Sequence, residues 1–232
     1  MTGRAKGARR PAILCDRAQA LRYDRLASMT RKGTRTGGTR ARIAAAAARI
    51  MAEDGIDDFS LAKRKAARQI GAPESQSLLA NDEIEAELRA YRALYQAVEH
   101  PLRIAELRRV ALGAMQALDA FSPYLTGAVL AGTAGPYAEI ELQLFPESAK
   151  DVELFLMNRN VSYTTREARR FSGDRSHPVS VLSLAWEGAP MRLSVFDPRA
   201  ERLALKTSQA GRVQQRAGAS EVAALLDKNA TA

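Results

Sequence analysis

The apolar residues of the chain change their spacing near residue 121. Before it they recur every three or four positions, as on one face of a helix; after it, short runs alternate between apolar and polar residues, as in strands. Segment 42–118 is therefore predicted to be helical, and segment 119–207 to combine strands with helices. A C-terminal tail, 208–232, is predicted to hold one short helix near 220–226. Helices first, then mixed strands and helices, indicate the α+β class.

Four helices are expected in the helical region. The alanine-rich segment 41–51 is strongly helix-forming. A second helix is predicted over 60–70, with Ser60 as its N-cap. Asn81 opens a third helix with a capping side chain followed by acidic residues, which suit the positive end of a helix. His100-Pro101 breaks the pattern, and a fourth helix follows.

The second half predicts a small mixed sheet. Segment 140–145 alternates as a half-buried strand does, and segment 151–158 has helical spacing. Two further strands are predicted over 179–186 and 191–196. The Glu-Gly-Ala-Pro segment 187–190 between them has the composition of a hairpin turn.

Charge is concentrated at the N-terminus. The formal net charge is +9, yet residues 1–42 hold twelve Lys or Arg and two Asp, so the remainder is close to neutral. Segment 1–41 is predicted to be a basic disordered tail, with a Gly/Thr-rich linker at 31–40. Such a tail could contact nucleic acid by neutralising phosphates. A solvated leader is the favoured interpretation, and Met29 is a possible alternative start, which leaves open whether residues 1–28 belong to the native protein.

Several protein classes are excluded by composition. The chain has one cysteine, Cys15, so an intrachain disulfide framework and cysteine-based zinc sites are ruled out. Apolar stretches are broken by charges well before the length of about 20 residues that a membrane span needs. No apolar core of a secretory signal follows the basic start. We therefore expect a cytoplasmic protein without a membrane span; the sequence does not indicate its oligomeric state.

The segment from Gly127 to Glu141 carries the candidate chemistry. On a strand, positions i and i+2 point to the same face, so Glu139 and Glu141 can converge on one divalent cation. Gly127 and Gly132 allow the backbone to approach a phosphate closely. A phosphate cradle beside carboxylates that hold Mg²⁺ is what transfer of a nucleotidyl group requires.

This segment resembles the signature of the polymerase-beta-type nucleotidyltransferase superfamily, especially its minimal members. The family pattern is Gly-Ser, a further Gly four residues after that Ser, then Ser-Asp-hydrophobic-Asp-hydrophobic. In register with it, in that order, stand Gly127, Ala128, Gly132, Ala138, Glu139 and Glu141. The resemblance covers roughly residues 118–198. It implies a nucleoside triphosphate substrate bound at Gly127, Ala128 and Gly132, Mg²⁺ held by Glu139 and Glu141 as the catalytic carboxylates, and an acceptor that the sequence does not identify.

The chain departs from the family pattern at the most diagnostic side chains. Ala128 lacks the hydroxyl that binds nucleotide phosphate in the family, and Glu139 is one methylene longer than the usual Asp. The family's third carboxylate comes from a neighbouring strand, where Ala185 and Arg192 occupy the kind of positions it could take. Glu187 and Asp197 are nearby substitutes at strand ends. The resemblance thus implies a degenerate site whose activity may be lost.

Three alternatives remain open from the sequence. Glu139 and Glu141 could simply form the solvent face of an amphipathic strand. The domain could be a non-catalytic member of the fold that binds a nucleotide or a partner. Segment 42–75 also resembles the opening of a Tet-repressor-type helix-turn-helix, although its would-be recognition helix, 73–80, lacks Arg or Lys to reach base edges.

Two other groups of residues are weaker candidates. His100 and His177, each before a proline, form neither a metal site nor a catalytic triad with the lone cysteine. A group of arginines follows the helix predicted over 151–158 and could meet a nucleoside triphosphate or RNA, or form a hairpin-like surface: Arg166, Arg169, Arg170 and Arg175.

Overall fold

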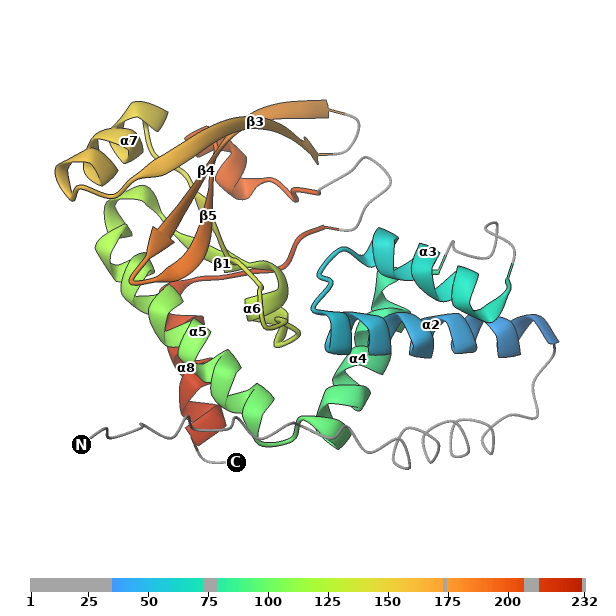
Figure 1. Ribbon diagram of the computed structural model, residues 1–232. Helices are drawn as coiled ribbons and strands as arrows, with labels where there is room; N and C mark the ends of the chain where they lie inside the picture. Colours follow the sequence, from blue (N-terminus) through green and yellow to red (C-terminus); the bar gives the residue numbers. More distant parts are fainter. Residues whose placement is uncertain (1–34, 73–78, 173–174, 207–212, 231–232) are drawn as a thin grey trace, which may run out of the picture. The chain divides into compact units, whose positions relative to one another are not determined.

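The computed structural model describes residues 35–72, 79–172, 175–206 and 213–230 (Figure 1). The chain divides into two compact units, 1–40 and 41–232. The predicted basic tail lies mostly outside the described residues, apart from 35–41. No described helix combines the length and the apolar character needed to cross a membrane.

The N-terminal half of the described chain is helical, as predicted. Its helices are α2 (Arg35–Asp54), α3 (Phe59–Ile70), α4 (Asn81–Tyr95) and α5 (Glu99–Ala117). Residues 35–40, expected to be linker, are instead the first turns of α2. An alanine-rich nucleus extends a helix cheaply once it has formed, because each added residue gains a hydrogen bond without a new nucleation cost.

The helix ends differ from the prediction in their capping residues. Asp58, not Ser60, caps α3: its carboxylate accepts hydrogen bonds from the backbone N–H groups of Ser60 and Leu61. Asn81 is the first residue of α4, and its side chain accepts a hydrogen bond from the Lys63 ammonium group instead of capping the helix. Pro101 lies within the first turn of α5, where a missing N–H costs no intrahelical bond.

The C-terminal half contains all the strands of the described chain. The elements after α5 are η2 (Asp119–Phe121), β1 (Tyr124–Thr126), α6 (Gly127–Ala131), β2 (Ile140–Leu144), α7 (Ala149–Asn158), β3 (Tyr163–Ser172), β4 (Arg175–Trp186), β5 (Ala189–Val195), η3 (Pro198–Arg202), β6 (Arg216–Ala217) and α8 (Ala219–Ala230). Helices followed by a mixed sheet make the protein α+β, as the sequence predicts.

The six strands form one sheet in the order β3-β4-β5-β2-β1-β6. The central pair, β2 and β5, is parallel, and every other neighbouring pair is antiparallel. Glu187 and Gly188, both with positive φ, make the tight turn between β4 and β5, which confirms the predicted hairpin. The parallel pairing sets Glu141 of β2 directly beside Arg192 of β5.

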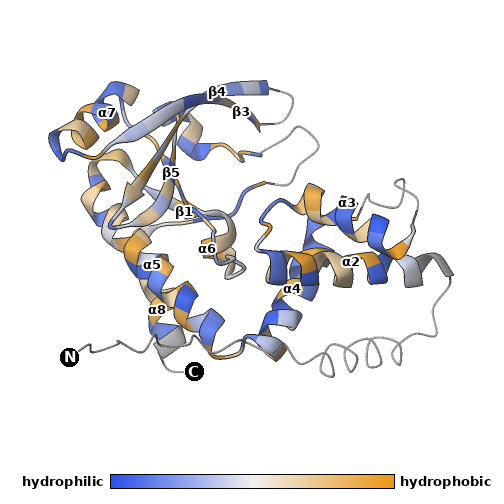
Figure 2. Ribbon diagram, viewed as in Figure 1, coloured by the Kyte–Doolittle hydropathy of each residue, from blue (hydrophilic) through white to orange (hydrophobic). Residues whose placement is uncertain are grey.

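One face of the sheet is buried against helices. Alternate residues of β2, β4 and β5 join the apolar side chains of α5 in a single core. Figure 2 shows the corresponding alternation of hydrophobic and hydrophilic residues along α5. That helix was grouped with the helical region on sequence, but its apolar face covers the sheet. Helix α8 adds Val222 to the same core. A second core joins α2, α3 and α4.

Strand β3 was missed by the sequence analysis. Its residues, Tyr163–Ser172, are mostly polar, and most of them are exposed or half-buried. It is an edge strand, paired only with β4 among the named strands, so neither face is fully covered. A strand that buries little has no strict alternation of apolar residues, and periodicity does not detect it.

Short helix α6 is fixed by a buried arginine from α5. Arg108 is 6% exposed, and its guanidinium donates hydrogen bonds to the backbone oxygens of Val129 (3.2 Å) and Leu130 (2.8 Å). The last carbonyls of a helix have no partner within the helix, and a cation at that end also suits the helix dipole. Arg108 therefore supplies the C-terminal partners that a helix this short needs to persist.

We expect Arg108→Met to lower the free energy of unfolding by about 2–3 kcal/mol, because two buried carbonyls lose charged donors. The neighbouring Arg109 is exposed and provides the control. Arg109→Met should change stability by no more than about 0.5 kcal/mol. Urea denaturation of both variants measures the difference. Equal effects would show that α6 does not depend on the buried guanidinium.

Candidate functional site

The two predicted carboxylates lie on the face of the sheet opposite the main core. Glu141 is the second residue of β2, and Glu139 precedes the strand by one residue. Ile140 and Leu142, on the other face, are fully buried. Neighbouring strands place Thr126 of β1 and Arg192 of β5 on either side of Glu141. The predicted convergence of the glutamates on one face is therefore observed.

A single guanidinium binds both carboxylates. Arg192 donates a hydrogen bond through Nη2 to Oε2 of Glu139, and its Nη1 lies 3.8 Å from Oε1 of Glu141. The three side chains are between 26% and 38% exposed, so solvent screens them only in part. Arginine presents its donors in a planar fork that suits two carboxylate oxygens at once. The position between the glutamates is filled by a side chain of the protein itself.

Gly127 lies against the carboxylate of Glu141. Its φ is +72°, and a Cβ atom there would be 3.0 Å from the carboxyl carbon of Glu141 and 3.2 Å from each oxygen. A residue with a side chain would be strained in this conformation and would also displace the carboxylate. The structure thus brings together two of the residues that the sequence singled out, one from the start of α6 and one from β2.

The other residues predicted to lie at the phosphate site, Gly132, Ala128 and Ala138, contact the protein itself. Gly132, with φ +72°, ends α6 in the left-handed conformation, and Arg108 is the nearest group to it. Ala128 packs against the main core, and its backbone oxygen accepts a hydrogen bond from the N–H of Thr133. Ala138 is buried. None of these three offers a side-chain hydroxyl to a phosphate.

The residues present do not fit the Mg²⁺ site that the resemblance implies. Mg²⁺ demands near-octahedral oxygen ligands at about 2.1 Å, and the space between the glutamates holds a guanidinium. Ala185 lies opposite Pro190 in the β4–β5 ladder and is exposed. Asp197 instead caps η3 by accepting from the N–H of Arg199. Within the described ranges, no three acidic, His or Cys side chains are grouped so that they could hold a metal.

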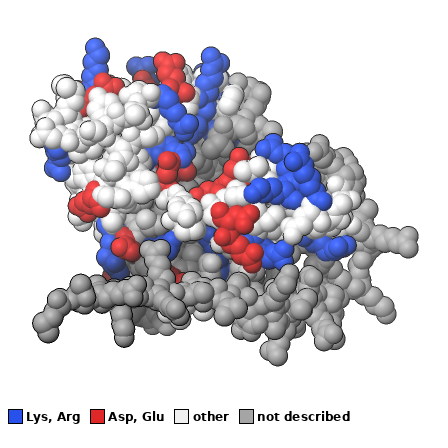
Figure 3. All heavy atoms as spheres, in the orientation of Figure 1, with Lys and Arg blue, Asp and Glu red and all other residues white. Residues whose placement is uncertain are grey.

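Further arginines surround the ion-paired cluster. Burial lowers the pKa of Arg170 in β3, Glu141 opposes this shift, and the nearby charges of Arg192 and Arg166 add to it. The Nε of Arg170 is buried without a hydrogen-bond partner. Basic and acidic side chains lie next to one another on the visible surface (Figure 3). The exposed part of this face, the open face, therefore combines two carboxylates with three guanidiniums, whereas the rest of the face packs into a third core that includes Val179 and Val181.

The loop that leads into Glu139 is held from the helical region. Asp57, between α2 and α3, accepts a hydrogen bond from the backbone N–H of Gly135. The residue as a whole is exposed, but its carboxylate lies against Gly135. Desolvation raises the pKa of Asp57; Arg92 and the Gly135 bond oppose the shift, and the charge of Glu139 adds to it. Sequence reasoning missed Asp57, which carries no motif.

Helices α4 and α5 hold the same loop through Arg92 and His100. Nη1 of Arg92 donates to the backbone oxygen of Ala134 at 3.1 Å and lies 3.0 Å from Nε2 of His100. Nε2 also lies 3.2 Å from the backbone oxygen of Ala134, so the ring donates to that oxygen when Nε2 carries the proton and accepts from the guanidinium when Nδ1 carries it. Burial, followed by the charge of Arg92, lowers the pKa of His100 to about 4.

The basic face of α3 is only partly available to nucleic acid. The ammonium group of Lys63 donates to the side chain of Asn81 at 2.8 Å and also to the backbone oxygen of Leu79. Lys65 lies 3.6 Å from Asp54. The segment predicted to be a recognition helix, 73–80, falls largely outside the described residues, and its last two lie outside helices and strands.

We expect Gly127→Ala to lower the free energy of unfolding by roughly 1–3 kcal/mol, because a positive φ is strained with a Cβ atom and that atom meets Glu141. The matched control is Gly113→Ala within α5, where a Cβ would have no neighbour within 4 Å. That change should raise stability by about 0.5–1 kcal/mol, as alanine favours helix. Chemical denaturation measures the free energy of unfolding of both variants. Changes of the same sign in the two variants would contradict the assigned geometry.

We also expect His100 to make the free energy of unfolding decrease as the pH is lowered. Its folded pKa is about 4 and its unfolded value about 6.5, so the unfolded chain binds an extra proton between these limits. The contribution, at most about 3 kcal/mol, is complete above pH 6.5 and is lost as pH falls to 4. His100→Gln should make the unfolding free energy depend less on pH over this window than it does in wild type. An unchanged slope would count against the buried neutral ring.

The chain gives no match to protein-family models, to curated proteins or to solved structures.

Proposed function

We propose that the C-terminal half of the chain is a nucleotidyltransferase-type domain that binds the phosphates of a nucleotide without a metal ion and does not transfer them. The observation that carries this proposal is the contact of Arg192 with both Glu139 and Glu141. In the family that the motif resembles, these positions hold Mg²⁺ together with a third carboxylate from a neighbouring strand. Here the neighbouring strand contributes a cation at that register.

An arginine in this position excludes the metal for electrostatic reasons. Arginine side chains in proteins carry a delocalised positive charge. A divalent cation would have to displace it, leaving a half-buried positive charge beside another positive charge. The extra methylene of Glu139 also moves its oxygens away from where a shorter acid would hold the metal. Both effects act against the octahedral geometry that Mg²⁺ requires.

The same arginines can take over the electrostatic task of the metal. Metal ions in phosphoryl-transfer sites neutralise phosphate charge, and arginine does so with two parallel hydrogen bonds. Arg166 is exposed on β3, and Arg170 carries an unpartnered Nε near Glu141. Gly127 is half-buried beside the cluster, with the Glu141 carboxylate against it. Binding would therefore use guanidiniums and leave the ligand chemically unchanged.

Nucleotide binding tests this proposal directly. A fluorescent nucleoside triphosphate should bind wild type equally well with Mg²⁺ and with EDTA, and no labelled nucleotide should be transferred to protein or RNA. If Mg²⁺ increased the affinity for nucleotide and the nucleotide were transferred, the proposal would be wrong.

The sharpest variant is Arg192→Asp, which supplies the carboxylate that the family pattern has on the neighbouring strand. We expect it to bind Mn²⁺, measured by electron paramagnetic resonance, where wild type binds none. Its affinity for nucleotide in the absence of metal should also fall by tenfold or more, because a hydrogen bond to a charged group contributes roughly 1.5–3 kcal/mol. Arg169→Asp, at an exposed position of β3, is the charge-matched control and should change neither property.

A further inference from the structure

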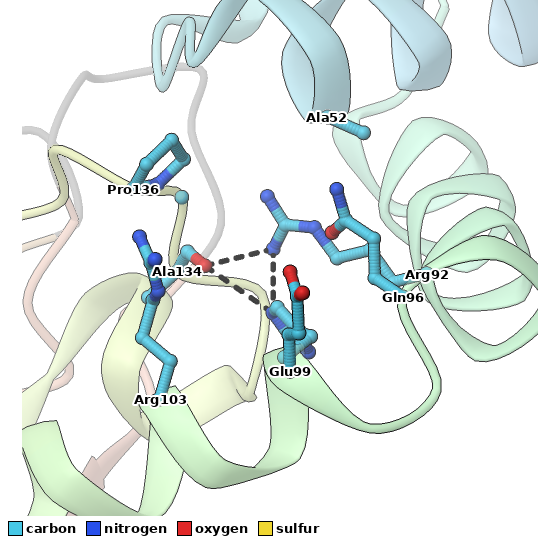
Figure 4. A pocket seen from close by; sticks show the side chains of 9 residues that line it. Ala52, Arg92, Gln96, Glu99, Arg103, Ala134 and Pro136 are labelled. Atoms are coloured by element: carbon cyan, nitrogen blue, oxygen red, sulfur yellow. Dashed lines mark hydrogen bonds between the residues drawn. The ribbon is translucent and has the colours of Figure 1, made fainter. Parts of the chain in front are cut away.

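A small pocket lies where the end of α4 and the start of α5 meet the loop before β2 (Figure 4). Its volume is about 80 Å³. Liquid water occupies about 30 Å³ per molecule, so the pocket has room for two or three waters or one tetrahedral ion. Its walls are formed by Arg92, Gln96, Glu99, His100, Arg103 and the backbone of residues 134–136.

Arg92 is the unusual feature of this pocket. It is 4% exposed, so its charge is almost wholly removed from solvent. Nη1 is used by the oxygen of Ala134 and by His100, whereas Nε is buried with no hydrogen-bond partner. Burial lowers the pKa of Arg92 to about 10, and Asp57 opposes this shift without a direct ion pair. A buried guanidinium with an unpartnered Nε can take an anion as a further hydrogen-bond partner.

We propose that this pocket binds a phosphate-like oxyanion between Arg92 and Arg103. The two guanidiniums lie on either side of Ala134 (Figure 4). Arg103 is exposed and long enough to close over a bound ion from the α5 side. The pocket is small, which selects a compact ion over a nucleobase or a sugar.

The other charged and titratable groups around the pocket affect how strongly it binds an anion. Glu99, at the exposed start of α5, opposes an anion and therefore weakens its binding. His100 is neutral and holds Arg92 in place through Nε2. Asp57 accepts a hydrogen bond from Gly135, and its charge, which raises the pKa of Arg92, also opposes an anion. A bound anion would partly cancel the charges of Arg92 and Arg103, both of which disfavour protonation of His100.

This site is independent of the proposed nucleotide-binding face. It uses side chains of α4 and α5, whereas that face uses residues of β2, β3 and β5. The two are connected through the loop 133–138, which leads from the pocket to Glu139. Failure of one proposal therefore leaves the other standing.

Titration of the full chain with inorganic phosphate, at constant ionic strength kept with chloride, tests the site. Calorimetry should give saturable binding, and Arg103→Gln should weaken it by about tenfold or more. Glu99→Gln should tighten it several-fold, because one like charge is removed. Arg109→Gln, at an exposed position of α5 that does not line the pocket, should leave it unchanged. The chain has two histidines, so a His177→Gln background lets NMR follow His100 alone. Its pKa should rise from about 4 when phosphate binds.

Two arms distinguish the source of the anion. Inorganic phosphate and glycerol 3-phosphate present the same oxygens, but the second carries an organic group. Binding of phosphate alone assigns the site to the free ion, and equal binding assigns it to a terminal phosphate ester. Absence of saturable binding by either overturns the proposal. So does binding that survives Arg103→Gln but disappears in Arg170→Gln, because the ion would then lie on the sheet.

Discussion

The ion-paired cluster of Arg192 with Glu139 and Glu141 is the constraint on which the open face of the sheet depends. Two carboxylates two positions apart on the same face repel each other unless a cation lies between them. In this chain the cation comes from the next strand, so the parallel pairing of β2 with β5 and the charge balance of the face support each other. Removing the guanidinium would leave two partly buried negative charges without a partner, which costs more than the pair itself contributes.

The same cluster determines the position of the residues around it. Gly127 approaches the carboxylate of Glu141 more closely than any side chain would permit, so the start of α6 is placed by a contact with β2. The far end of α6 is placed by Arg108 from α5. A helix of five residues has too few internal hydrogen bonds to persist alone. Its geometry is therefore imposed from both ends by long-range contacts of charged side chains.

The sequence predicts the parts of this arrangement that depend on residues close together in the chain. It does not predict the parts that depend on contacts between distant segments. The alternation of Glu139 to Leu144 is local, so the strand and the shared face of its two acids were predicted correctly. From the sequence, Arg192 was only a position that a carboxylate could take. Its ion pair with Glu139 and Glu141 could not be predicted, because it depends on the register between two strands about fifty residues apart. Strand β3 escaped detection because an edge strand with little burial has no alternation. The capping role of Asp58 differed from the prediction by two residues, since several residues near that helix start have side chains that can cap it.

The contrast between Arg192 and Arg92 shows what kind of ligand each place can accept. Arg192 is bound to two carboxylates, so its charge is already balanced, and a phosphate there must compete with or share those partners. Arg92 is bound to a carbonyl oxygen and a neutral imidazole, which satisfy geometry but carry no charge. Neutral acceptors stabilise a buried cation less than an ionised acceptor does. The open face is thus suited to a multivalent ligand that several arginines can share, whereas the pocket at Arg92 is suited to one small anion held by direct hydrogen bonds.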